Sequence, residues 1–473
     1  MNEGHTWGGG AALSPWDTVM WRLEEDPHTR STSVIVEVLD RVPDWDRLVQ
    51  AHIRGSFQVP RMRERVVEPP LPLVTPAWSA DPNFDVDHHL YRIGLPEPGT
   101  FEQLGEVVAD VLQRPLDRTR PPWEAVLVTG LEGGKAAYLF KSHHSFADGM
   151  ALMQMLELLH SRTSAPGTRQ VPPAPKRPKV NGYTLLAGRL VGRAMGTPGA
   201  LLRSAPKLPG KVFVNPFTTT SQIVGYARSL GRQVAPTVER SPLLKGKGGL
   251  GIRVLLFEVS LDDLRSAGRA AGGSINDAYL AAVVGGLRRY HEHRGHVVPQ
   301  IPISIPVSTR RPGDPLGGNQ FTGVRLVAPL GETDPEQRII LLREQVRAAR
   351  SEAALDWLAV ASRVLDKLPV AALAEIAFAG TSTADAQLSN FPGVGWEAYV
   401  AGAKVLGIYP VGPRPGVAMM AALASYEGKA CLGFNVDPDV FPDIDLLHRC
   451  LLEGFDEVFT LTSSATDTSE KAP

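Results

Sequence analysis

An 81-residue stretch without a single acidic side chain divides this sequence into two parts. Residues 158–238 contain no Asp or Glu, but they hold twelve Lys and Arg and ten Pro. Such a run between two regions of regular periodicity is typical of a linker or a surface excursion. We therefore expect two α/β halves, residues 11–161 and 246–462, joined by a basic, proline-rich segment over residues 162–245.

The composition and the chain ends narrow the class of protein. The chain has 473 residues, 43% of them hydrophobic, and its 49 basic and 50 acidic side chains nearly cancel. This composition supports large cores and excludes fibrous, disordered and polytopic membrane proteins, and the lack of a basic excess disfavours nucleic-acid binding. The N-terminus does not resemble a signal peptide, and two cysteines suit a reducing compartment. We expect a cytoplasmic protein with a disordered tail over residues 463–473.

Both halves show the periodicity of mixed strands and helices. In the first half we predict helices over residues 44–53 and 149–160, and strands over residues 33–39, 61–67, 123–129 and 136–141. In the second half we predict strands over residues 252–259, 303–307, 321–328, 386–391, 417–424 and 430–436. Ser260 is predicted to cap a helix that starts near Leu261, and further helices are predicted over residues 275–291, 335–349, 354–379 and 443–460.

The local pattern most indicative of chemistry is Ser-His-His-Ser-Phe-Ala-Asp-Gly over residues 142–149, where a predicted strand ends and a predicted helix begins. Loop residues at strand ends commonly carry catalytic groups. Histidine can act as a general base near neutral pH without a large pKa shift. Adjacent histidines point in different directions, so His143 and His144 cannot share one task. Asp148 is expected in the first turn of the helix, and Gly149 permits close packing of the backbone.

Other active-site patterns fit the sequence less well. A metal site from His143, His144 and Asp148 would need adjacent histidines to converge on one ion, so we expect no metal. Gly246-x-Gly248-x-x-Gly251 matches a dinucleotide fingerprint, but it precedes a strand instead of following one. The Gly-x-Ser-x-Gly pattern of serine hydrolases does not occur.

The string His-His-x-x-x-Asp-Gly resembles the active-site motif of the coenzyme A-dependent acyltransferase superfamily, which includes chloramphenicol acetyltransferases and the condensation domains of nonribosomal peptide synthetases. Further stretches are similar, in the same order, to bacterial wax ester synthase/diacylglycerol acyltransferases: residues 13–17, 115–124, 276–277, 306–308, 318–319 and 389–393. The resemblance covers residues 13–459. The chain departs from the family pattern at Pro122 and Phe391, where Leu and an aliphatic residue are usual.

The resemblance implies the fold and the reaction. It implies two chloramphenicol-acetyltransferase-like halves, each a mixed sheet with flanking helices, and a tunnel between them. It implies acyl transfer from acyl-CoA, which is a substrate, to diacylglycerol or a long-chain fatty alcohol, with no cofactor. His144 would act as general base on the acceptor hydroxyl and then protonate the leaving thiolate, and His143 would be structural.

Further residues are expected to support the site. We expect Asp148 to pair with Arg63 or Arg65, which alternate on one predicted strand face. Asn390, or backbone beside it, is a candidate oxyanion donor. Asn276 and Asp277 either cap their helix, or Asn276 faces the acyl chamber.

Two other functions stay open. A condensation-type enzyme would take its acyl group from a carrier protein, which the basic segment could dock. A catalytically silent relative would bind lipid surfaces. Residues 183–204 mix leucines with three arginines and no acid, which is typical of an interfacial helix. This composition predicts peripheral contact with anionic membranes or lipid droplets, with packing on the protein's own domains as the alternative.

Overall fold

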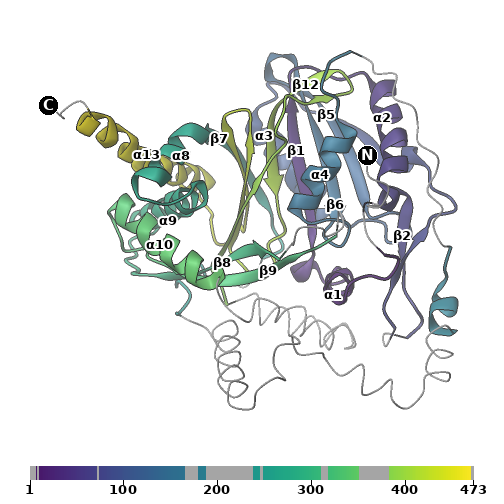
Figure 1. The fold of residues 1–473 in the computed structure, drawn as a ribbon, viewed down its shortest axis with the longest axis horizontal. Helices are drawn as coiled ribbons and strands as arrows, with labels where there is room; N and C mark the ends of the chain where they lie inside the picture. The colour runs from purple at the N-terminus through teal and green to yellow at the C-terminus, as the bar shows by residue number, and fades with distance from the viewer. Residues whose placement is uncertain are drawn as a thin grey trace.

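The computed structural model describes residues 7, 10–71, 74–165, 179–187, 238–245, 249–309, 318–350 and 383–469. Within these residues, the strands form two six-stranded sheets and one two-stranded pair. Both large sheets are mixed and flanked by helices, which confirms the predicted fold class (Figure 1). The predicted helix over residues 354–379, and most of the predicted basic segment, lie outside the described residues.

The N-terminal sheet has the order β11-β12-β1-β6-β5-β4. Its strands are β1 (Thr32–Leu39), β4 (Leu90–Gly94), β5 (Trp123–Leu131), β6 (Lys135–His143), β11 (Tyr399–Val400) and β12 (Ala403–Val411). Only the β4–β5 pair is parallel among the described strands of this sheet. Helices α2 (Trp45–Gln58) and α4 (Gly149–Leu159) pack on one face, and α3 (Phe101–Gln113) packs on the other.

The C-terminal sheet has the order β7-β14-β13-β10-β8-β9. Its strands are β7 (Arg253–Ser260), β8 (Ile301–Ser308), β9 (Phe321–Ala328), β10 (Ala386–Pro392), β13 (Met419–Tyr426) and β14 (Lys429–Val436). Four helices pack around its core: α8 (Leu261–Ala270), α9 (Ile275–His293), α10 (Pro335–Arg350) and α13 (Ile444–Ser469). Ser260 caps α8, as predicted, because its side chain accepts a hydrogen bond from the backbone N–H of Asp263.

The C-terminal part of the chain contributes two strands, β11 and β12, to the N-terminal sheet. Strand β12 belongs to the C-terminal part of the sequence, yet it pairs with β1, with Val411 opposite Val34. A Cβ atom on Gly433 in β14 would lie 2.1 Å from the carbonyl oxygen of Pro410 in β12, so the two sheets approach here at backbone distance. The described part of residues 246–462 therefore contributes strands to both large sheets.

Some predicted elements differ from the structure. The predicted strand over residues 61–67 starts with a 3-10 helix, Pro60–Arg63, and only Glu64–Val67 is a strand (β2), which pairs with β3 (Ala77–Ala80). Helix α1 (Pro15–Leu23), α3, β4 and β12 were not predicted. Helix α13 continues to Ser469, into the predicted disordered tail. None of the described helices is both long and apolar enough to cross a membrane.

Candidate active site

The loop between β6 and α4 carries the two histidines. His143 is the last residue of β6 and Asp148 is the N-cap of α4, so Asp148 precedes the first turn in which we predicted it. Its carboxylate accepts hydrogen bonds from the backbone N–H groups of Ala151, at 2.8 Å, and Gln320, at 3.0 Å. Asp148 therefore caps its own helix and also holds a loop from the C-terminal half.

The predicted pairing of Asp148 with Arg63 or Arg65 is wrong. Arg63 donates to the hydroxyl of Ser56, and its guanidinium lies 4.7 Å from the rings of Phe57 and Phe84. Arg65 donates to the carbonyl oxygen of Thr119. Arg63 lies in the 3-10 helix before β2, whereas Arg65 lies in β2 itself. Their side chains therefore do not share one strand face.

Arg61 approaches the loop instead. It donates to the carbonyl oxygen of Ser145 at 3.4 Å, and its guanidinium lies 4.2 Å from the centre of the Trp78 ring. The sequence offered no reason to prefer Arg61 over its neighbours.

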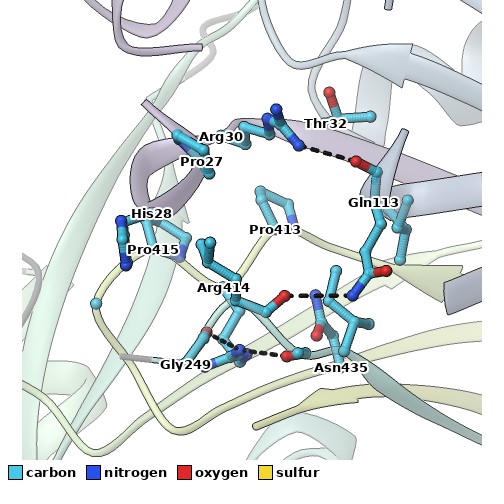
Figure 2. Close-up of a pocket in the computed structure, with 15 residues that line it drawn as sticks. Pro27, His28, Arg30, Thr32, Gln113, Gly249, Pro413, Arg414, Pro415 and Asn435 are labelled. Carbon is cyan, nitrogen blue, oxygen red and sulfur yellow. Dashed lines mark hydrogen bonds between the residues drawn. The ribbon is translucent and has the colours of Figure 1, made fainter. Parts of the chain in front are cut away.

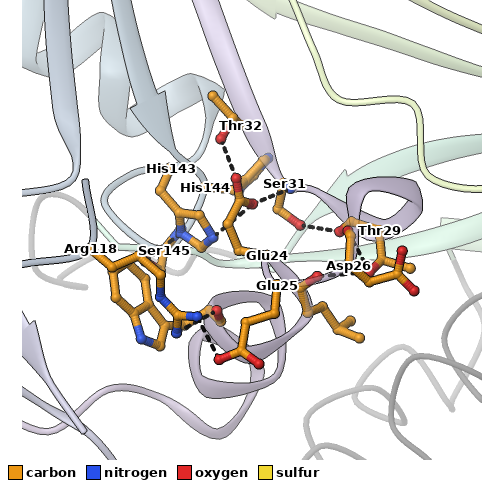
Figure 3. A network of polar contacts seen from close by, with 12 residues as sticks. Glu24, Glu25, Asp26, Thr29, Ser31, Thr32, Arg118, His143, His144 and Ser145 are labelled. Atoms are coloured by element: carbon orange, nitrogen blue, oxygen red, sulfur yellow. Dashed lines mark hydrogen bonds and ion pairs between the residues drawn. The ribbon is translucent and has the colours of Figure 1, made fainter. Parts of the chain in front are cut away.

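His143 is buried and engaged on both ring nitrogens (Figure 3). Nδ1 accepts a hydrogen bond from the backbone N–H of Ser145 at 3.0 Å, so Nδ1 carries no proton and the ring proton lies on Nε2. Nε2 faces Oε2 of Glu24 at 3.3 Å. Glu24 also accepts from the Ser31 N–H and the Thr32 hydroxyl. His143 thus lies in a structural environment with no face open to substrate.

His144 is half-buried and faces a different environment. Its backbone N–H donates to the carbonyl oxygen of Ser31 at 2.7 Å, and Nδ1 lies 2.8 Å from Oδ1 of Asn319. Burial lowers the pKa of His144 below the usual 6.5, although the Asp148 carboxylate and the Asn319 hydrogen bond act in the opposite direction. The lowered pKa favours the neutral imidazole, which is the form that a general base requires.

A cavity of about 130 Å³ lies beside His144, between the two halves. Its walls come from β1, α4, β8, β9, β10, β13 and the end of β12, and they include Ile35, Met150, Leu152, Pro306, Phe321, Phe391, Val411 and Met420. Asn390, the candidate oxyanion donor, also lines it. A Cβ atom on Gly149 would lie 3.0 Å from the Phe391 ring, which explains the small residue there. Most of the lining is apolar, and its polar groups include the His144 imidazole, the Asp148 carboxylate and the amides of Gln387 and Asn390. Such a chamber suits an acyl group beside a base.

A second, larger cavity of about 430 Å³ opens nearby (Figure 2). Arg30 and Thr32 line it from the N-terminal half, and Arg414 and Asn435 line it from the C-terminal half. Thr32 and Ser33 are neighbours on β1, and each lines one of the two cavities, while Pro413 lines both. The cavities therefore adjoin where β1 begins and β12 ends. A continuous tunnel stays a prediction.

The Asn276–Asp277 pair lies at the start of α9. Ser274 is the N-cap, and Asp277 completes a capping box by accepting from the Ser274 N–H at 2.8 Å. Asp277 therefore helps to cap its helix, which is one of the two roles that we considered for the Asn276–Asp277 pair. Asn276 is half-buried in the same turn and is not among the described residues that line the His144 cavity.

Two polar residues at the loop were not identified as site residues from the sequence. Asn319 contacts His144 from 175 residues away, and Glu24, from a different part of the chain, contacts His143. The stretches containing Asp17 and Asn319 carry family resemblance, but no local pattern shows which partner each side chain meets.

Comparisons with known sequences identify the family to which this chain belongs. The wax ester synthase/diacylglycerol acyltransferase catalytic domain matches residues 13–279, and the C-terminal domain of the same family matches residues 317–458. A Mycobacterium tuberculosis (strain H37Rv) protein named "putative diacyglycerol O-acyltransferase" is 38% identical over 452 residues, covering 95% of this chain and 92% of that protein. A second protein of that strain with the same type of name is 29% identical over 399 residues, covering 81% and 76%.

Solved structures show the same fold. The wax ester synthase/diacylglycerol acyltransferase from Marinobacter aquaeolei VT8 superposes with a TM-score of 0.63 at 19% identity, covering 96% of this chain and 100% of that chain. The first condensation domain of the CDA synthetase gives a TM-score of 0.59 at 15% identity, covering 95% and 96%. At such identities the likeness concerns the fold alone. The family matches and the 38% identical relative show that the chain belongs to the wax ester synthase/diacylglycerol acyltransferase family and is an acyltransferase.

Proposed function

We propose that this enzyme transfers a long-chain acyl group from acyl-CoA to the hydroxyl group of diacylglycerol, with long-chain fatty alcohol as a second acceptor. One observation carries the proposal: His144 lines a mainly apolar cavity between the two halves while its Nδ1 is already bound to Asn319. Nε2 is then the nitrogen available to the acceptor hydroxyl.

The reaction requires one base and no covalent enzyme intermediate. Nε2 of His144 takes the proton of the acceptor hydroxyl while the oxygen attacks the thioester carbonyl. The tetrahedral intermediate collapses, the C–S bond breaks, and the imidazolium returns the proton to the thiolate to give free coenzyme A. General-base catalysis contributes about 10²–10⁴-fold. Positioning and oxyanion stabilisation supply the rest, the latter from Asn390 or backbone near it.

The two cavities suggest a route for each substrate. Arg30 and Arg414 line the larger cavity, and none of the described residues that line it is Asp or Glu. Arg414 is neutralised by a buried ion pair with Asp437 at 3.1 Å, whereas Arg30 donates to a carbonyl oxygen, that of Gln113. The charge of Arg30 suits the phosphates of an acyl-CoA. The apolar cavity beside His144 suits the acyl chain and the lipid acceptor.

The test is an assay with the purified full chain and radiolabelled palmitoyl-CoA, with dioleoylglycerol and hexadecanol as separate acceptors. We expect His144→Ala to abolish transfer, His143→Ala to leave more residual activity, and Asp148→Ala to reduce activity by disturbing the loop. Equal turnover by His144→Ala and the parent would overturn the proposal. Palmitoyl-carrier protein as donor separates it from the condensation-type alternative, which requires that donor to be preferred.

We also propose that the basic segment brings the enzyme to anionic membrane or lipid-droplet surfaces, because its substrates are insoluble. Most of that segment lies outside the described residues, so the argument rests on its composition. Each basic residue near an anionic surface contributes about 1 kcal/mol, and salt screens that attraction. Flotation with anionic and neutral liposomes at low and high salt tests this role. Binding that ignores both lipid charge and salt would contradict it.

A further inference from the structure

The side-chain amide of Asn319 has only one orientation that satisfies its neighbours. Its Nδ2 lies 2.6 Å from Oδ1 of Asp17 and also donates to the backbone carbonyl of His144. A carbonyl oxygen accepts hydrogen bonds and never donates them, so the NH₂ group must face this side. Oδ1 of Asn319 is left facing Nδ1 of His144 at 2.8 Å.

This orientation determines the tautomer of His144. Oδ1 of an amide only accepts hydrogen bonds, so Nδ1 must carry the ring proton. A neutral imidazole has one ring proton, and the lone pair therefore lies on Nε2. The ring is also held in place by Phe321, whose centroid is 5.3 Å away. In the other tautomer, two lone pairs would face each other across 2.8 Å.

Asp17 and Asn319 come from different halves. Asp17 is buried in α1, where its backbone N–H donates to the Ser14 hydroxyl that caps the helix. Asn319 lies just before β9, in a stretch that also contacts Asp148 through the N–H of Gln320 and the carbonyl oxygen of Gly318. Figure 1 shows β9 extending from the C-terminal sheet toward α1 and the end of β6. His144 therefore keeps its contact with Asn319 only when residues 318–320 pack against the N-terminal half.

We propose that Asn319 is a positioning residue that fixes the reactive tautomer of His144, and that Asp17 fixes Asn319 in turn. This inference rests on the assignment of His144 as the base. Asn319 is not among the described residues that line either cavity, so it acts through His144 rather than on substrate.

The first test compares Asn319→Leu with Asn83→Leu, a change on an exposed surface residue. We expect Asn319→Leu to lower kcat about 10- to 100-fold, within the roughly 10²–10⁴-fold contribution of a general base. KM for palmitoyl-CoA should change less than about 3-fold, because the cavity walls are intact. Asn83→Leu should change neither constant. A large rise in KM with kcat unchanged would show that Asn319 binds substrate, and would overturn the proposal.

The second test exchanges the two side chains. Asn319→Asp alone places two carboxylates in direct contact, so we expect lower activity. The double variant Asp17→Asn/Asn319→Asp restores an amide-to-carboxylate pair, and kcat should recover at least 5-fold over the single variant. A carboxylate beside Nδ1 favours imidazolium, so the acid limb of the pH profile should move to higher pH in the double variant. A purely structural role would leave that limb in place, and an unmoved limb would contradict the proposal.

A third measurement does not depend on activity. Nitrogen-15 NMR of the full chain with labelled histidine distinguishes Nδ1–H from Nε2–H, and the His144 signals are those missing from His144→Ala. We expect the Nδ1–H form in the parent and a mixture of tautomers in Asn319→Leu. If the parent shows Nδ1–H and no acyl transfer occurs, the proposed function fails while this inference stands. An Nε2–H form in the parent would overturn the inference.

Discussion

Glu24 and His143 face each other across a buried contact, with Oε2 of Glu24 3.3 Å from Nε2 of His143. Glu24 follows the end of α1, and the same carboxylate accepts hydrogen bonds from Ser31 and Thr32 at the start of β1. One side chain therefore joins α1, β1 and the loop that carries the base. The backbone N–H of His144 completes the link by donating to Ser31.

We expect Glu24→Gln to destabilise the protein by about 1–3 kcal/mol at pH 7, because buried partners lose a charged acceptor. Burial alone would raise the pKa of Glu24, but the interaction with His143 and the hydrogen bonds from Ser31 and Thr32 outweigh it and lower that pKa below 4.5. The stabilisation is therefore full above pH 4.5 and is lost as the pH falls through the lowered pKa.

Urea unfolding at pH 7 and below pH 4 measures this loss. The matched control is Glu25→Gln, since Glu25 is exposed and pairs with Arg118 at the surface. Such a pair contributes about 0–1 kcal/mol. Equal losses from the two variants would contradict the role of Glu24.

The pH profile of acyl transfer should report the environment of His144. Burial lowers its pKa, so the neutral base persists below pH 6.5, and the acid limb of kcat/KM should have its midpoint there. The Asp148 carboxylate raises that pKa in part. Asp148→Asn should therefore move the limb to still lower pH. An acid limb centred above pH 6.5 in the parent would be inconsistent with a buried base.

The contact between the two sheets should tolerate no side chain at Gly433. A Cβ atom there would lie 2.1 Å from the carbonyl oxygen of Pro410 and 3.0 Å from the Val411 side chain. Overpacking of this kind costs about 1–3 kcal/mol, and it should also lower activity, because Pro410 and Val411 line the cavity beside His144. Thermal unfolding and turnover of Gly433→Ala measure both effects. Gly395→Ala is the control, since a Cβ atom there meets nothing within 4 Å.

His52 should make the protein sensitive to mild acid. Burial lowers its pKa to about 4, while its ring bonds to the Leu48 carbonyl and the Tyr138 hydroxyl. Below about pH 6.5 the imidazole of His52 gains a proton in the unfolded chain but stays neutral in the folded chain. The free energy of unfolding therefore falls by about 3 kcal/mol between pH 6.5 and pH 4. Unfolding free energies across this range should vary less in His52→Gln than in the parent. The exposed control His88→Gln should keep the parent's slope.

The sequence predicted correctly those strands and helices that a local residue pattern indicates. The β-branched run of β1, the hairpin of β5 and β6, and the strand-to-helix junction at His143 and His144 all lie where the sequence predicts them. Strand β12 escaped prediction because Gly407 and Pro410 interrupt its pattern and its partner β1 is remote in sequence. Helix α3 has an apolar stripe, but the strands on which it packs include β1 and β7, which belong to different halves.

The site was predictable only in its central motif. His144 and Asp148 stand out by residue type and spacing, whereas Glu24 lies in a Glu-Glu-Asp run that resembles a solvated surface. Asn319 is 175 residues from His144, and no periodicity relates the two. The prediction that Arg63 and Arg65 share one face was wrong because Arg63 lies in a 3-10 turn, where side chains do not alternate as in a strand. Contacts between remote segments follow from the folded backbone, and a single sequence does not display them.

The pairing of β12 with β1 also bears on how this chain is made. During synthesis, β1 pairs with β6 early, but its other edge stays open until residues 403–411 leave the ribosome. An unpaired strand edge is a template for pairing with other chains. The nascent N-terminal half must therefore be guarded against aggregation for most of its translation, and the N-terminal sheet is completed only when nearly the whole polypeptide has emerged.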